Sequence, residues 1–256
     1  MKTERAVTLE LPQVRAWLKQ PPAPRRARRG AGKEARLLVL GGRYQDEKWL
    51  AAAAQGRDVW AVDWGMEACR SAGVKPSRVV GDMDSISFGA KVTMILGKIP
   101  SDRFPAEKDE TDFQLALGLA RGDVVVTGCW GRRFDHAFSN IFTTLLAPRL
   151  GARILCFADE REALFPLFGP GELRLKFIQP PLALSLLPLT ETVRGVTARG
   201  VRWPLSDAEL LQSRPYAVSN VPDGDGVEGE GEANIFVSLK EGALGVYAVF
   251  DVEGTF

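Results

Sequence analysis

A chain of 256 residues, 45% of them hydrophobic, is long enough for one large domain or two small ones and apolar enough to bury a core. Its formal net charge of +1 excludes a bulk electrostatic attraction to nucleic acid or to an acidic membrane, so we expect neither as a partner. The sequence has no apolar run of about 20 residues, no signal-peptide core and no CxxC pair among Cys69, Cys129 and Cys156; we therefore expect a cytoplasmic protein with reduced thiols and without a disulfide scaffold or zinc site.

Residues 1–35 are predicted to be an N-terminal extension. Their second half combines prolines with a cluster of arginines at Arg25, Arg26, Arg28 and Arg29. One interpretation is a tail that binds nucleic acid or an acidic partner. We favour a solvated, flexible linker, because no aromatic residue is interleaved with the arginines.

Between residues 36 and 160, short apolar segments alternate with helical ones. This rhythm predicts an α/β domain whose mostly parallel sheet is covered on both faces, and ligands of such sheets bind beyond the carboxyl ends of the strands. Strands are expected at 36–42, 58–63, 78–82, 91–96, 123–128 and 153–159, and helices at 47–55, 66–73, 110–121 and 135–150.

The rhythm changes after residue 160, and residues 161–256 are predicted to form a smaller all-β domain, either a sandwich or a barrel. Strands separated by Gly, Pro and Asp are expected at 171–177, 182–189, 193–203, 216–221, 233–239 and 243–250, and at most a turn or two of helix at 206–213.

The first candidate site follows the strand expected at 78–82, in the tract Gly81-Asp82-Met83-Asp84-Ser85. Asp82 and Asp84 would point to opposite faces of a regular strand, but they can converge on one cation where the chain turns at a strand end. Gly81 permits that turn, and carboxylate oxygens beside a phosphate suit Mg²⁺. An ordinary Asp-rich turn is the alternative, and this tract alone does not decide between them.

Asp63 ends the strand expected at 58–63, so it should lie at the same edge of the sheet as Asp82 and Asp84. The alternative is that Asp63 caps the helix that follows.

The tract Lys108-Asp109-Glu110-Thr111-Asp112 leads into the helix expected at 110–121. Asp109 and Asp112 are three residues apart and so share a helix face. Asp109 is equally well explained as the N-cap, and Asp112 also suits the helix dipole. Lys108 either neutralises phosphate charge or is solvated.

A fourth cluster, from Gly128 to His136, joins a strand to a helix and includes Gly131, Arg133 and Asp135. Glycines before a helix N-terminus form a natural anion site, and arginine adds a bidentate phosphate clamp. His136 is the one histidine of the chain; it is either a structural residue or a general base.

These clusters fall at successive strand ends of one sheet, where they can face one pocket. Several carboxylates with arginine and glycine loops suit metal-assisted phosphoryl-type transfer. The tract GGRYQDE lacks the GK[ST] ending of a P-loop, so we do not expect a P-loop enzyme.

From Gly41 to Val249 the sequence resembles the thiamine pyrophosphokinase family. The resemblance rests on an ordered set of tracts: GG after the first strand, AVDWG, AGVKPSRVVGDMDSI, EKDETDFQLAL, GRRFDHAFSNI, and later GVRWPL followed by SN. It implies that ATP donates a pyrophosphoryl group to the hydroxyl of thiamine, in a homodimer of chains with an N-terminal α/β domain and a C-terminal β domain.

The resemblance also implies roles for individual residues. Asp63, Asp82, Asp84 and Asp112 would form the catalytic acidic cluster, with Asp82, Asp84 and Asp112 holding Mg²⁺. The nucleotide would be bound by Lys108, Thr111, Gly131, Arg133 and Asp135, and thiamine by Trp203, Ser219 and Asn220. For Trp203, a place in the core of the β domain is the alternative.

Two positions depart from the family pattern. Trp64 stands where the family has the third residue of ADGG, and Arg132 stands where it has the second glycine of GGR. Both are bulky residues beside the expected nucleotide. Two other functions therefore stay open: a pyrophosphokinase for another heterocyclic alcohol such as a hydroxymethylpterin, and a non-catalytic protein that binds thiamine or a nucleotide.

Overall fold

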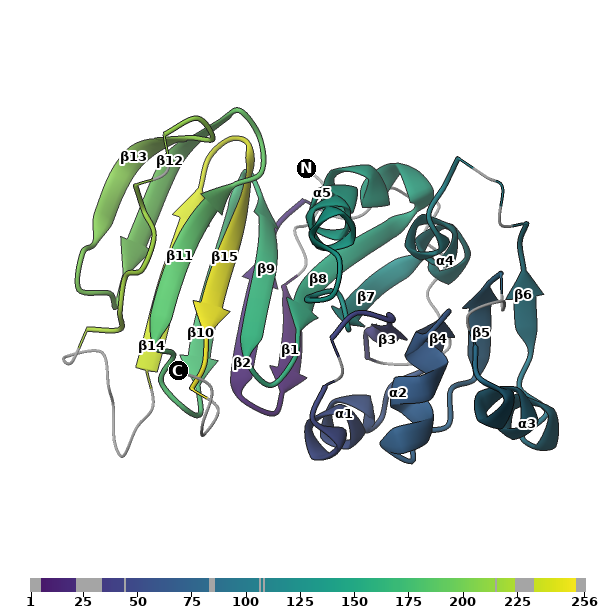
Figure 1. Cartoon of the computed structure of the whole chain (residues 1–256). Helices are drawn as coiled ribbons and strands as arrows, with labels where there is room; N and C mark the ends of the chain where they lie inside the picture. The colour runs from purple at the N-terminus through teal and green to yellow at the C-terminus, as the bar shows by residue number, and fades with distance from the viewer. Residues whose placement is uncertain are drawn as a thin grey trace. The chain divides into compact units, whose positions relative to one another are not determined.

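The computed structural model describes residues 6–21, 34–43, 45–82, 86–105, 107, 109–214, 216–223 and 233–251 (Figure 1). The chain divides into two compact units: Ala23–Asp159, and Met1–Pro22 together with Glu160–Phe256. We call them the α/β unit and the β unit. The β unit therefore draws on both ends of the chain.

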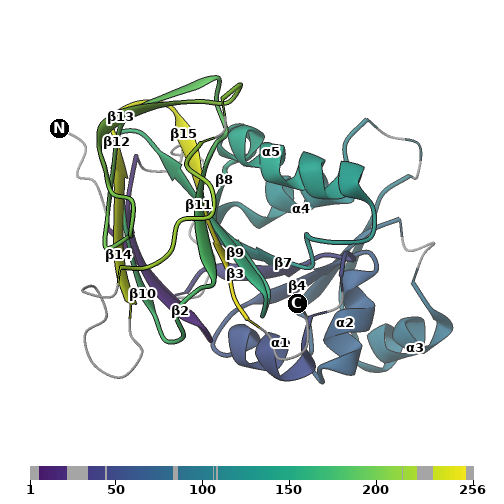
Figure 2. The same cartoon turned by 60° about the vertical axis from the view of Figure 1, so that its left-hand side comes forward.

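The α/β unit contains a parallel sheet with the strand order β8-β7-β3-β4-β5-β6. Figures 1 and 2 show helices α1 to α3 on one face of this sheet and α4 and α5 on the other. The strands are β3 (Arg36–Val39), β4 (Val59–Val62), β5 (Arg78–Gly81), β6 (Ser101–Arg103), β7 (Gly122–Thr127) and β8 (Ala152–Ala158). The helices are α1 (Glu47–Ala54), α2 (Gly65–Ser71), α3 (Phe88–Leu96), α4 (Asp112–Ala120) and α5 (Phe134–Leu150).

The strand order reverses between β3 and β7. From β3 the chain continues outward to β4, β5 and β6, and it then returns to β7 on the other side of β3. Such a reversal opens a crevice at the carboxyl ends of the two strands, because the connections on either side lead away from each other. Here residues 41–43 and 128–133 follow those ends, so a ligand site is expected between these loops.

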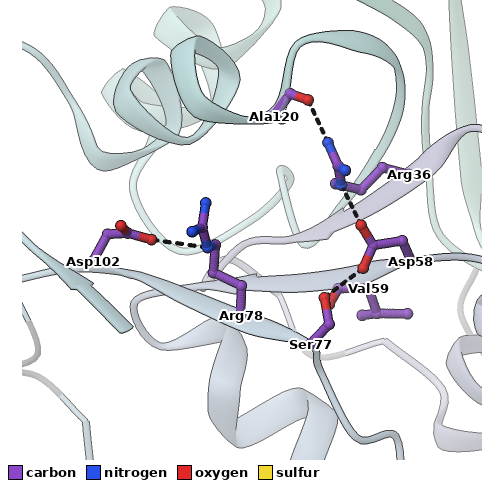
Figure 3. Close-up of polar contacts among 7 residues, drawn as sticks. All are labelled: Arg36, Asp58, Val59, Ser77, Arg78, Asp102 and Ala120. Carbon is purple, nitrogen blue, oxygen red and sulfur yellow. Dashed lines mark hydrogen bonds and ion pairs between the residues drawn. The ribbon is translucent and has the colours of Figure 1, made fainter. Parts of the chain in front are cut away.

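Ion pairs fasten the opposite, amino edge of the sheet (Figure 3). The Arg36 guanidinium pairs with Asp58 at 2.8 Å, and Asp58 also accepts a hydrogen bond from the Ser77 hydroxyl. Burial alone would raise the pKa of Asp58, but the bonds from Ser77 and Arg36 outweigh it and hold that pKa below its usual value. Arg78 pairs with Asp102 at 3.1 Å. These charges satisfy one another, which indicates a structural role for this edge.

The β unit is antiparallel. One sheet has the order β1-β2-β10-β14-β12-β13, and a second set of strands pairs in the order β11-β15-β9. The members are β1 (Val7–Leu11), β2 (Val14–Lys19), β9 (Glu162–Phe168), β10 (Gly171–Phe177), β11 (Ala183–Pro188), β12 (Thr192–Arg199), β13 (Leu205–Leu211), β14 (Ala233–Leu239) and β15 (Ala243–Val249). Every second side chain of β10 is buried, as expected for a sheet with one face on a core.

The prediction of a flexible extension over residues 1–35 is wrong for residues 7–19. These residues form the hairpin β1–β2, which pairs with β10 and so extends the larger sheet. Buried and exposed side chains alternate along both strands, with Leu9, Leu11, Val14 and Leu18 in the core. This period-2 pattern was present in the sequence, but charged residues between the apolar ones obscured it. The cluster of arginines at 25–29 lies outside the described residues.

Three further element predictions are wrong. Residues 91–96, expected as a strand, belong to helix α3, which begins at the N-cap Ser87. Residues 206–213 were expected to be at most a short helix, but most of them lie in strand β13. The strand expected at 216–221 is replaced by an irregular segment with one isolated bridge between Asn220 and Leu184. Strands β6 and β9 were not predicted. Short or fully buried strands carry little periodicity to recognise.

Candidate functional site

The loops that follow β3 and β7 lie against each other at the carboxyl edge of the sheet. The Gly42 N–H donates to the Gly128 carbonyl at 2.8 Å, and the Arg43 N–H donates to the Trp130 carbonyl at 2.6 Å. A Cβ atom on Gly42 would lie 2.3 Å from the Gly128 oxygen, so only glycine permits this approach. The glycines after β3 thus allow the loop after β3 to pack directly against the loop after β7.

Asp63 lies where the sequence placed it, beside the end of β5. Its N–H donates to the Val80 carbonyl at 2.9 Å, and a Cβ atom on Gly81 would be 1.8 Å from the Asp63 Oδ1 atom. The Asp63 carboxylate therefore packs on Gly81, directly before Asp82. Asp63 is not a helix cap, because α2 has Trp64 at its N-cap and no side-chain capping bond. Its φ of +46° is a left-handed conformation, which often marks a functional position when held by a non-glycine residue.

The predicted magnesium ligands are only partly described. Asp84 and Lys108 lie outside the described residues. Among the residues that are described, no group of three or more His, Cys, Asp or Glu side chains is placed to hold a metal ion. Asp63 and Asp82 supply two carboxylates in adjacent loops, a hard-oxygen donor set of the type that Mg²⁺ prefers.

Asp112 is the first residue of α4, and Thr111 is its N-cap. The Thr111 hydroxyl oxygen accepts from the Gln114 N–H at 3.2 Å, and the Gln114 side chain accepts from the Thr111 N–H at 3.0 Å. This capping box gives Thr111 the structural role that the sequence had offered to Asp109. Helix α4 connects the parallel strands β6 and β7, so its first residues lie at the carboxyl edge of the sheet. This is the edge at which the sequence predicted Asp112.

The loop after β7 is held in an unusual backbone conformation. Gly131 and Arg132 both have positive φ, at +72° and +54°. The Arg132 guanidinium lies 5.2 Å from the centre of the Trp64 ring, so the two bulky departures from the family pattern are in contact with each other. Helix α5 begins with Arg133 at its N-cap, whose side chain makes no capping bond, and the start of a helix is a favourable place for an anion.

Arg133 and Asp135 face each other at the start of α5. Two hydrogen bonds of 3.1 and 2.5 Å join the guanidinium to the carboxylate, and both side chains are exposed. The bonds from Arg133 hold the pKa of Asp135 below its usual value, and the same pair raises the pKa of Arg133. Asp135 also accepts from the His136 N–H at 3.0 Å. The pair therefore orients the Arg133 guanidinium at the start of α5.

In the β unit the structure brings the three predicted thiamine residues together. The Asn220 side chain accepts from the Trp203 N–H at 3.1 Å and donates to the Trp203 carbonyl at 2.8 Å. The neighbouring Ser219 N–H donates to the Ser185 hydroxyl at 3.0 Å. Trp203 is 57% exposed, so the alternative of a core residue is wrong. Asn220 fixes the backbone of Trp203 and leaves its ring at the surface.

Two acidic residues that sequence reasoning missed support the same edge. Glu67 of α2 is buried and accepts from the Ser87 N–H at 2.9 Å, at the start of α3 and just beyond the Asp82–Asp84 tract. Burial would raise the pKa of Glu67, but hydrogen bonds from Ser87 and Arg70 lower it overall. Asp159 is also buried and pairs with Arg43 at 2.5 Å. Neither residue belongs to a recognisable motif, because Glu67 binds Ser87 and Asp159 binds Arg43, and both of these partners are distant in sequence.

Comparisons with known proteins agree with this arrangement. Residues 53–155 match the model "Thiamin pyrophosphokinase, catalytic domain", and residues 179–229 match "Thiamin pyrophosphokinase, vitamin B1 binding domain". The first match covers the loops after β4, β5 and β7. The second match covers Trp203, Ser219 and Asn220.

Curated relatives show the same similarity. Thiamine pyrophosphokinase of Bacillus subtilis is 28% identical over 188 residues, which are 72% of this chain and 87% of that protein. Thiamine pyrophosphokinase 1 of Arabidopsis thaliana is 24% identical over 186 residues, 67% of this chain and 68% of that protein.

Solved structures share the fold. The crystal structure of thiamine pyrophosphokinase from Bacillus subtilis superposes with a TM-score of 0.72 at 21% identity, over 86% of this chain and 100% of that one. Yeast thiamin pyrophosphokinase superposes with a TM-score of 0.67 at 14% identity, over 87% and 88% of the two chains.

Within the described residues, no helix is long and apolar enough to cross a membrane.

Proposed function

Because the chain belongs to the thiamine pyrophosphokinase family, we propose that it transfers the pyrophosphoryl group of ATP to the hydroxyl of thiamine, giving thiamine diphosphate and AMP. The observation that carries most weight is the Asp63 carboxylate packed on Gly81, directly before Asp82. This contact supports an acidic cluster at the carboxyl edge of the sheet. Phosphoryl-type transfer to a hydroxyl needs such oxygen ligands to hold Mg²⁺ beside the phosphates.

Asp82, Asp84 and Asp112 are the residues that would hold Mg²⁺, with Asp63 beside them to orient the substrate hydroxyl. When bound, Mg²⁺ would offset phosphate charge and polarise the phosphorus under attack. The donor set fits this ion, since Asp63 and Asp82 come from adjacent loops and Asp112 from a helix that begins at the same edge.

The nucleotide would be bound by Gly131, Arg133 and Asp135, together with Lys108 and Thr111. In support, the start of α5 is a favourable place for an anion, and Asp135 orients the Arg133 guanidinium. The Thr111 oxygen is used by the capping box, so its hydroxyl would act toward a phosphate as a donor.

Thiamine would contact Trp203, Ser219 and Asn220 of the β unit. An exposed indole ring suits a cationic heteroaromatic ring, a contact worth roughly 0.5 to 2 kcal/mol. Asn220 holds the Trp203 backbone in place, which orders the ring before binding. We further propose a homodimer, on the strength of the family resemblance, and a cytoplasmic location, because the three cysteines are buried and form no disulfide with one another.

The acceptor is tested by incubating the protein with Mg²⁺, ATP and one alcohol at a time, and measuring AMP. We expect AMP with thiamine and none with 6-hydroxymethylpterin. AMP with the pterin alone would replace thiamine by another heterocyclic alcohol. Thiamine binding in calorimetry without AMP from any acceptor would show a binding protein and not an enzyme.

A further inference from the structure

A row of alternating aromatic and cationic side chains crosses the larger sheet of the β unit. The strand register places Trp17 of β2 opposite Arg174 of β10, Arg174 opposite Phe236 of β14, and Phe236 opposite Arg199 of β12. All four lie on the face turned away from the core, because their neighbours along each strand are buried. Directly opposite residues of adjacent strands are close enough to interact side by side.

The two arginines of this row are held over an aromatic ring. The Arg174 and Arg199 guanidinium carbons lie 5.6 and 5.8 Å from the centre of the Phe236 ring. Among the residues that the structure describes, neither arginine makes an ion pair. On the same face, by contrast, Arg15 pairs with Glu10 at 2.9 Å. Within the described ranges, the row therefore places two positive charges side by side with no carboxylate paired to either.

The row lines a surface groove of about 770 Å³ that also includes Gly200 and Asn234. This volume lies within the range of about 300 to 1,000 Å³ that is usual for small-molecule sites. Gly200 has a φ of +75°, and a Cβ atom there would lie 2.1 Å from the Asn234 carbonyl, so the glycine permits a close approach of backbone that a side chain would prevent. The net charge of +1 argues against a polyanion as the occupant.

We propose that this groove binds a small anionic ligand with a flat ring, of the chemical class of a mononucleotide, through residues other than the proposed catalytic ones. Guanidinium groups bind phosphate through charge-assisted hydrogen bonds, and an aromatic ring beside them, such as that of Trp17, accepts a stacked base. Arg174 and Arg199 flank Phe236, so one ligand can place its phosphate on an arginine and its ring on the adjacent aromatic side chain.

Trp17 and Phe236 lie outside both regions that match the family models, residues 53–155 and 179–229. Trp17 comes from the hairpin β1–β2, so the groove depends on the N-terminal strands of this chain. Arg199 and Gly200 lie within the second region, so the groove combines residues inside and outside the matched regions.

The test is photoaffinity labelling of the full-length protein with 8-azido-AMP, followed by mass spectrometry of the labelled peptides. We expect label on the peptides that contain Trp17 or Phe236, and competition by unlabelled AMP. In the double variant Arg174→Ala/Arg199→Ala, the probe concentration at half-saturation of this label should rise by roughly tenfold or more. The reason is that each charge-assisted hydrogen bond contributes to the affinity for the phosphate. Label confined to other peptides would overturn the proposal.

The matched control is Arg15→Ala, which removes one positive charge from the same face but leaves the groove intact. It should label like the wild type. An equal loss of label in this control would show that general surface charge, and not the groove, attracts the probe, and would also overturn the proposal. Competition by inorganic pyrophosphate as strong as by AMP would remove the stacked ring from the proposed ligand class.

Discussion

Asp63 combines a left-handed backbone with a carboxylate held against Gly81. Replacing it by Asn keeps the shape and removes the charge, so we expect turnover with thiamine to fall by roughly 10² to 10⁴, the usual cost of losing a positioned acid–base group. The thermal midpoint should stay close to that of the wild type. Asp123→Asn is the matched control. Asp123 pairs with Arg153 at the amino end of β7, away from the carboxyl ends of the strands where the predicted site lies. Equal activities of the two variants would contradict this assignment.

Trp203 allows a second test at the same scale. Its exposed ring makes Trp203→Ala a substitution that should raise the KM for thiamine by roughly twofold to 30-fold, the equivalent of one cation–π contact. The KM for ATP and the thermal midpoint should not change. A large fall in the thermal midpoint with an unchanged KM for thiamine would instead make Trp203 a packing residue.

Among the secondary-structure elements, α2 is linked to the start of α3 by the hydrogen bond that the Ser87 N–H donates to the Glu67 carboxylate. Burial raises the pKa of Glu67, but the hydrogen bonds from Ser87 and Arg70 lower it by more. The pKa of Glu67 is therefore lower in the folded chain than in the unfolded one. A lowered pKa stabilises the fold above the unfolded value of 4.5, and this contribution is lost as the pH falls below it through the folded pKa. Urea unfolding of wild type and Glu67→Gln should therefore differ at neutral pH and converge in acid. A difference that is independent of pH would exclude this linkage.

The hairpin β1–β2 supports a packing prediction for an element that the sequence did not reveal. Leu18 is 1% exposed, so Leu18→Ala should cost about 2 to 5 kcal/mol in the free energy of unfolding. Arg15→Ala, at an exposed position of the same strand, should change the free energy of unfolding by less than about 0.5 kcal/mol. Chemical denaturation of both variants decides this. Equal, small effects would show that the hairpin does not pack on the β unit in solution.

For the molecule as a whole, the sequence predicted the parallel α/β arrangement and the meeting of Asp63 with the end of β5. Both follow from local patterns, because apolar strands that alternate with helices bring their carboxyl ends to one edge. The hairpin at 7–19 was missed, since its pairing with β10 joins segments more than 150 residues apart. The same reason explains why the sequence did not reveal Glu67, Asp159 and the Trp17 groove. Each depends on a contact with a residue that is distant in the chain.

The most direct test of the central claim is the stoichiometry of products when the protein turns over ATP and thiamine with Mg²⁺. Transfer of a pyrophosphoryl group at the carboxyl edge of the sheet predicts equal amounts of AMP and thiamine diphosphate, and no ADP. Formation of ADP with thiamine monophosphate, or no product that depends on thiamine, would contradict the account.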